Sequence, residues 1–155
     1  MVHMDIPEEV ARAFIGPRAP YYLRRWARIE QGRSPTLGFN WAAFFWTVFW
    51  MLYRWMYWPF WITTASLAAL TVLEGLLLRV PAQVDVALNV VFVVTMGTFA
   101  NYWYYRHALK QWRQATATGD VLPQHLAARG GTRVWPVLLA AFGLFVLLYL
   151  ALGTA

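Results

Sequence analysis

The side chains in this sequence that could carry chemistry are few, and the most isolated is a single acid in an apolar stretch. Glu74 is the only charged residue in the range 60–78. A carboxylate inside a membrane is costly, so it indicates either an ion or proton pathway or a local structural pairing. Asn89 would face Glu74 if the stretches on either side of a tight turn at 79–83 are antiparallel. We expect the Glu74 carboxyl to reach the interface or to pair locally, beside Arg79, and to hold this hairpin together.

Polar and aromatic side chains also gather around His107. This histidine follows Tyr104 and Trp103 by about one helical turn, and the three could hold a lipid headgroup, a quinone or the ring of a pigment. They are therefore candidate cofactor-binding residues, although a histidine at a helix end is commonly only hydrogen-bonded or solvated. Asn101 shares this stretch with Gly97, where a small residue permits close helix approach and an interhelical hydrogen bond from Asn101.

Other kinds of active site find little support. The chain contains no cysteine, which excludes disulfides, thiolate nucleophiles and cysteine metal ligands. The metalloprotease, nucleophile-elbow and phosphate-loop motifs are also missing. His3 and His125 have the spacing of no metal site. The sequence therefore predicts a protein that is not an enzyme and holds no metal, and it leaves any cofactor unidentified.

The composition is typical of a membrane protein. Of the 155 residues, 60% are hydrophobic and only 13% are charged, and the mean hydropathy is +0.43. A soluble domain of this size could not bury so much apolar surface. We therefore expect an all-α integral membrane protein.

A tryptophan-rich segment at residues 39–57 is the most distinctive part of the chain. Tryptophan prefers the boundary between lipid tails and headgroups, and the 15 residues from Phe39 to Tyr53 carry no charge. They would form about 22 Å of helix, too short for a hydrocarbon core of about 30 Å. We expect a helix that lies in the interface or re-enters it. The residues predicted at the interface are Trp41, Trp46, Trp50, Arg54, Trp55, Trp58 and Trp61, together with Arg24, Arg25 and Arg28.

Three further apolar stretches are long enough to cross a bilayer. They cover about residues 60–78, 84–105 and 134–152, each close to the roughly 20 residues that a span requires. Residues 39–155 thus form the predicted membrane domain, with three transmembrane helices and the aromatic interfacial helix. Residues 1–38 form a predicted cytosolic segment.

That cytosolic segment is predicted to contain helices. A short one would end at Gly16. In the range 21–31, Tyr22, Trp26 and Ile29 recur at helical spacing beside a basic flank. This amphipathic helix would either rest on anionic headgroups or pack on the protein's own cytosolic side.

The distribution of Lys and Arg predicts the orientation. If residues 39–57 return to the cytoplasmic side, twelve of the 13 Lys and Arg residues are inside and only Arg79 is outside, as the positive-inside rule expects. If they cross, Arg54 lies in or near hydrocarbon at a cost of about 2.5–3.5 kcal/mol. We therefore expect a cytoplasmic N-terminus, three spans and an external C-terminus. The net charge of +6 follows from this rule, which argues against a nucleic-acid partner.

Several motifs resemble a family of small bacterial inner-membrane proteins filed as a domain of unknown function. They are the run FNWAAFF at residues 39–45, then Trp50, then Leu52, Tyr53 and Arg54, then Met56 and Tyr57, with further similarity at residues 21–23, 100–101, Tyr104 and His107. Where the family usually has Gly-Pro, this chain has Thr47 and Val48, which favours a straighter helix without a kink. The resemblance implies a bacterial inner-membrane location and no established activity.

Three functions are consistent with these features. The leading one is a small accessory protein that packs against a larger membrane complex or itself and helps its assembly. The second is a binder of a lipid, quinone or tetrapyrrole in the aromatic zone of residues 39–61 and 101–107, on the cytoplasmic side. The third is an oligomeric transporter or pore lined by Glu74. The expected partners are membrane lipids and other membrane-protein subunits.

Overall fold

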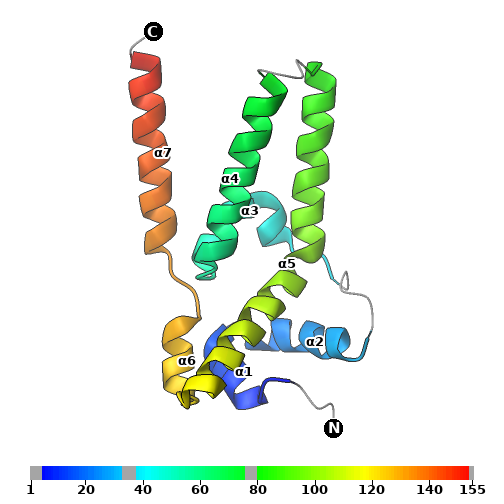
Figure 1. Ribbon diagram of the computed structural model, residues 1–155, viewed down its shortest axis with the longest axis vertical. Helices are drawn as coiled ribbons and strands as arrows, with labels where there is room; N and C mark the ends of the chain where they lie inside the picture. The colour runs from blue at the N-terminus through cyan, green and yellow to red at the C-terminus, as the bar shows by residue number, and fades with distance from the viewer. Residues whose placement is uncertain (1–4, 33–37, 76–79, 154–155) are drawn as a thin grey trace.

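The computed structural model describes residues 5–32, 38–75 and 80–153, and this part of the chain forms seven helices and no strand (Figure 1). The all-α prediction is therefore confirmed. The helices are α1 (Glu8–Ile15), α2 (Ala19–Glu30), α3 (Trp41–Tyr53), α4 (Tyr57–Leu73), α5 (Ala82–Thr118), α6 (Pro123–Arg129) and α7 (Trp135–Gly153).

The helices form a head and three projecting rods. Helices α1, α2, α6 and the C-terminal half of α5 pack together as the head. Helices α4, α7 and the N-terminal half of α5 extend from it in one direction, and α3 lies where the two regions meet (Figure 1). The rods α4 and α7 pack on α3, so α3 connects them to the head.

Helix α5 belongs to both regions. It has 37 residues, which make about 55 Å of helix, well beyond a hydrocarbon thickness of about 30 Å. Large apolar side chains from Val84 to Val94 are mostly exposed, whereas its buried positions begin at Met96 and continue to Ala115. One continuous helix therefore leads from an apolar surface into the head.

Of the described helices, α5 alone is both long and apolar enough to cross a membrane. Helices α4 and α7 are apolar but shorter within the described residues. They overlap the predicted spans at 60–78 and 134–152, and three crossings remain a prediction.

The core of the head is aromatic. The Tyr104 ring is fully buried, with its centroid 5.0 Å from that of Tyr22 and 5.5 Å from that of Trp26. Because Tyr22 and Trp26 come from α2, the apolar face of this helix is used inside the protein and is not free to insert among lipids. Arg24 and Arg28 remain exposed on the other face. Of the two alternatives for this helix, packing on the protein itself is the one observed.

Helix α3 is kinked, and the expectation of a straighter helix is wrong. Thr47 has φ 37° and ψ −109° inside the helix, a region that residues with a Cβ rarely adopt. Ala43 before the kink and Trp50 after it are both buried. Packing on both sides therefore imposes a glycine-like conformation on a threonine.

Helix α6 was not predicted. Helix α5 ends at Gly119 in the left-handed conformation, with φ 72°, and the chain then turns back so that α6 packs on α1. The backbone N–H of Gly131 donates to the Phe14 carbonyl at 2.6 Å. A Cβ at Gly130 would overlap Phe14, so this contact requires a residue without a side chain.

Candidate functional site

A groove beside α5 brings together the two stretches of the predicted aromatic zone. It has a volume of about 800 Å³, and we call it the α4–α5 groove. Its lining residues come from α3, the α3–α4 connection and α4 (Met51, Met56, Trp58, Pro59, Ile62 and Thr63) and from α5 (Trp103, Arg106, His107, Leu109, Lys110, Gln111, Arg113, Gln114 and Ala117).

The α5 wall of the groove is one face of one helix. Trp103, Arg106, Lys110, Arg113 and Ala117 recur at intervals of three or four residues, which places their side chains on a common face. Arg106, Lys110 and Arg113 are exposed cations on this face, and no Asp or Glu is among the lining residues. An anion in the groove would therefore meet three cations without a competing acid.

A pair of asparagines fixes α3 against α5. Asn40 caps α3 by accepting a hydrogen bond from the Ala43 N–H at 3.1 Å. Its Nδ2 donates to Oδ1 of Asn101 at 3.0 Å, and its backbone N–H donates to the carbonyl of Gly97 at 2.7 Å. The predicted roles of Asn101 and Gly97 in close approach are thus observed, with the N-terminus of α3 as the partner. Phe39 packs where a side chain at Gly97 would lie.

The three candidate cofactor residues point to different places. Trp103 and His107 line the groove, whereas Tyr104 is in the core of the head. The His107 ring centroid lies 6.2 Å from that of Phe14, and its Nε2 is buried without a hydrogen-bond partner. Because this nitrogen is shielded, His107 does not offer Nε2 to the groove as a ligand atom.

The residues predicted at the membrane interface lie in two environments. Four tryptophans are more than 60% exposed, namely Trp41, Trp46, Trp58 and Trp61. Trp50 and Arg54 are instead buried within the protein. Trp55 is half-buried, with the guanidinium of Arg133 3.9 Å from the centre of its ring. These four exposed tryptophans come from α3 and from the beginning of α4.

Glu74, which we expected to face Asn89, forms no hydrogen bond with it among the described residues. Glu74 is 7% exposed, and its Oε1 has no hydrogen-bond partner there. Asn89 is exposed and donates to the Asp85 carbonyl in its own helix at 2.9 Å. Arg79 lies outside the described residues. Among the described residues, Glu74 therefore has no polar partner with which it could line an ion path.

The described residues contain no cluster of three or more acids, histidines or cysteines that could hold a metal ion. His125 bonds to Asp120, which also accepts from Arg129 at 2.7 Å. These contacts, led by the His125 hydrogen bond, hold the pKa of Asp120 below its usual value. Their position at α6 indicates a role in closing the α5–α6 turn. His3 lies outside the described residues.

Sequence reasoning did not identify Lys110 and Arg113 as site residues, nor Met51 and Met56. The spacing of the two cations from Trp103 and His107 was the available signal for the α5 wall. No comparable signal marks the methionines, because they enter the groove only through the turn between α3 and α4.

These features define an all-helical protein with one candidate membrane helix and a basic groove that has aromatic walls. The family model described as "Protein of unknown function (DUF2628)" matches residues 8–110, which are 103 of the 155 residues. The chain belongs to this family, as the resemblance to an uncharacterised family led us to expect. The match includes α1 to α4 and the part of α5 that carries Arg106, His107 and Lys110. Comparisons with curated proteins and with solved structures found no match.

Proposed function

We propose that this protein binds an anionic phospholipid at the cytoplasmic face of a bacterial inner membrane. The observation that carries the proposal is the α4–α5 groove, where three cations and no acid adjoin an apolar wall that includes Trp58 and Ile62. The headgroup would contact the cations, and the acyl chains would follow the apolar wall along α4.

The length of α5 supports this arrangement. A hydrocarbon core of about 30 Å takes up about 20 residues of helix, which correspond to residues 82–101 if α5 enters at its first residue. Arg106 and Lys110 follow Asn101 by about 8 Å and 14 Å along the axis. Because the headgroup layer adds about 5–8 Å outside the hydrocarbon, Arg106 falls at its outer edge. Lys110 and Arg113 follow about 6 Å and 10 Å farther along the axis, where a headgroup drawn into the groove would meet them.

The charge in the groove is large enough to matter. A basic residue near an anionic surface contributes about 1 kcal/mol. Three of them would favour an anionic over a neutral lipid by about 3 kcal/mol, roughly a hundredfold in affinity. A quinone makes less use of the site because it is neutral. A tetrapyrrole metal would find Nε2 of His107 buried.

We propose the orientation that the charges predict: a cytoplasmic N-terminus, three spans and an external C-terminus. The three rods extend from the head in one direction (Figure 1), which supports it. Single cysteines at Gln124 in α6 and Leu152 in α7 should react with a membrane-impermeant maleimide from opposite sides of sealed inner-membrane vesicles. Labelling from the same side would refute this topology.

The lipid proposal is tested by the lipids that remain bound after purification in a mild detergent. Native mass spectrometry of the protein should detect bound phosphatidylglycerol in preference to phosphatidylethanolamine. The double variant Lys110→Gln and Arg113→Gln removes two cations and should weaken phosphatidylglycerol binding by about 2 kcal/mol, roughly 30-fold.

The control variant is Arg28→Gln, because Arg28 is exposed on α2 and does not line the groove. It should leave phosphatidylglycerol binding unchanged. If it weakens binding as much as the double variant does, the lipid responds only to net charge and the groove is not its site. Equal binding of neutral and anionic lipids would also refute the proposal.

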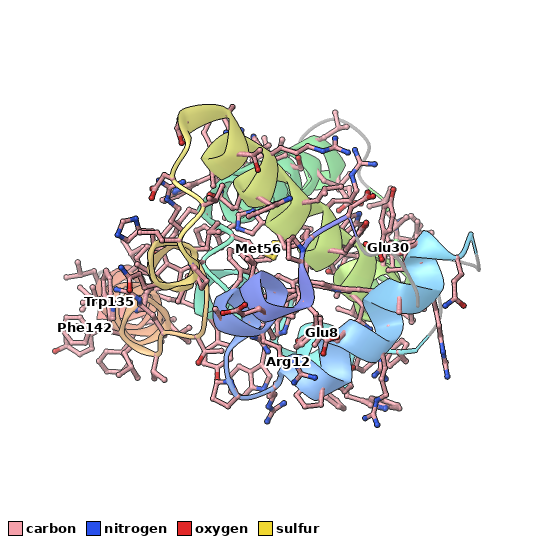
Figure 2. All side chains as sticks on the ribbon, turned by 90° about the horizontal axis from the view of Figure 1, so that it is seen from below. Glu8, Arg12, Glu30, Met56, Trp135 and Phe142 are labelled. Carbon is pink, nitrogen blue, oxygen red and sulfur yellow. The ribbon has the colours of Figure 1, made fainter. Side chains whose placement is uncertain are left out.

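An accessory role in a membrane complex is a second proposal, supported by α7. This helix contacts the protein chiefly through α3, and its large apolar side chains, including Phe142 at 65% exposure, face outward. Figure 2 shows Trp135 and Phe142 at the edge of the molecule. Purification with a crosslinker followed by mass spectrometry should find a stoichiometric protein subunit attached to α7. Recovery of the monomer alone would refute it.

A further inference from the structure

A second cavity lies on α2 and α3 and shares no lining residue with the α4–α5 groove. Its volume is about 590 Å³, and we call it the arginine pocket. Three arginines line it: Arg18 before α2, Arg25 within α2, and Arg54 at the end of α3. No Asp or Glu is among its lining residues. The pocket therefore brings three positive charges together with aromatic side chains.

Arg54 is the unusual member, because it is only 1% exposed. Its Nη1 donates to the carbonyl of Ile15 at 3.3 Å, and its guanidinium carbon lies 4.6 Å from the Tyr22 ring centre and 5.1 Å from that of Tyr104. Its Nε has no hydrogen-bond partner, and no carboxylate of the described residues forms an ion pair with it. A buried cation without a counter-charge is expensive.

Aromatic faces and one carbonyl compensate part of that cost. A cation over an aromatic ring is attracted by the negative face of the ring, and the carbonyl of Ile15 ends α1, where the helix dipole favours positive charge. These interactions can hold Arg54 in place. They leave its charge without the anion that a buried arginine normally has.

Arg25 repeats this pattern in the lining of the pocket. Its guanidinium lies 3.6 Å from the centre of the Tyr21 ring, and Nη1 donates to the Tyr21 carbonyl at 3.2 Å. Its Nε is also buried without a partner. These contacts hold the guanidinium in place, and guanidinium N–H groups are donors that bind phosphate or carboxylate oxygens.

Part of the pocket lining is apolar. It comes from Trp41, Trp46 and Phe49 of α3, from Val134 just before α7, and from Val137 in the first turn of α7. Trp41 and Trp46 are largely exposed. Because α7 is one of the rods, a chain that leaves the pocket along this wall would continue into the membrane region.

We propose that the arginine pocket binds the phosphate of a second amphiphile, a phosphomonoester lipid such as phosphatidate, with its chains between α3 and α7. The phosphate lies among Arg18, Arg25 and Arg54 and supplies the counter-charge that Arg54 lacks. A doubly charged monoester suits three guanidinium groups, whereas a zwitterionic headgroup would bring an ammonium that no acid of the pocket can pair.

The test uses full-length protein in detergent micelles, titrated with phosphatidate that carries a photoreactive diazirine in one acyl chain. Binding is measured by native mass spectrometry, and the attachment site by digestion after illumination. Trypsin should release residues 134–155 as a peptide that borders only the arginine pocket, and residues 55–79 as one that borders only the α4–α5 groove. We expect labelling of the 134–155 peptide at the lowest lipid concentrations, and no equivalent labelling by phosphatidylcholine with the same chain.

The decisive variants keep Arg54, because its removal could unfold the head. Arg18→Gln with Arg25→Gln should weaken phosphatidate binding roughly a hundredfold or more, the loss expected for two hydrogen bonds to a charged group. The matched control is Arg24→Gln with Arg28→Gln. It also removes two positive charges, from exposed positions of α2 that do not line the pocket. It should leave binding unchanged.

Three results would overturn the proposal. One is equal weakening by both double variants, which would reduce the effect to surface charge. Another is equal labelling by phosphatidylcholine. The third is displacement of phosphatidate by the same concentration of glycerol 3-phosphate, which would make the ligand a soluble phosphate. The variants Lys110→Gln and Arg113→Gln of the groove should leave labelling of the 134–155 peptide intact, so failure at one site is distinguishable from failure at the other.

Discussion

Replacing Thr47 with glycine should stabilise the protein. Thr47 has a positive φ of 37° in the middle of α3, and a residue with a Cβ in such a sparsely populated region costs about 1–3 kcal/mol. Glycine adopts this conformation without that strain, but its freer unfolded chain takes back about 0.4–1 kcal/mol. We expect a net gain of about 1 kcal/mol. For a chain of this size, that raises the thermal midpoint by about 2–4 °C.

The measurement is thermal unfolding in a mild detergent, followed by tryptophan fluorescence and circular dichroism. Thr47→Ala is the matched control, because alanine removes the hydroxyl and the β-branch but keeps the Cβ that causes the strain. It should change the midpoint much less than glycine does. If alanine stabilises as much as glycine, the gain comes from side-chain packing. If glycine lowers the midpoint, the strain argument fails.

Two substitutions at the contact between α3 and α5 should destabilise the head in the same assay. Asn101→Ala removes one buried hydrogen bond, of 3.0 Å, and one partly buried, of 2.7 Å, and should cost about 1–3 kcal/mol. Asn89→Ala, at an exposed site, should stay within about 0.5 kcal/mol. Gly97→Ala would place a methyl group on the Phe39 ring and should cost about 1–3 kcal/mol. In contrast, Gly143→Ala on α7 has open space and should be neutral or stabilising. Equal effects within either pair would contradict these contacts.

The sequence predicted the positions of the helices better than it predicted which segments pack against one another. The apolar runs located α4, α5 and α7, because a rod that faces lipid needs only hydrophobic residues of sufficient length. The head is different, because its core is formed between segments far apart in the chain. Tyr104 was a candidate ligand-binding residue from its position beside His107, but three aromatic rings from α2 and α3 surround it.

Arg54 shows the same limit at the candidate sites. Its place after an uncharged aromatic run predicted a cation at the membrane surface. The structure buries it because α1 ends beside it and provides the Ile15 carbonyl, a contact 39 residues away that no local pattern indicates. The α5 wall of the groove could be found from helical spacing alone, whereas the arginine pocket could not, since its arginines come from two elements that meet only in the folded head.

The kink and the contacts at both ends of α3 support its proposed place in the membrane. Thr47 divides 13 residues into two pieces of about 9 Å each, and neither piece approaches the thickness of a bilayer. Asn40 at the start of α3 is bonded to α5, and Arg54 at its end is bonded to the last turn of α1. The chain therefore enters and leaves α3 on the side of the head, and α4 is the first helix that can lead away from it. If all three rods cross the membrane, the number of crossings is odd. The cations of the head then lie on one side of the membrane.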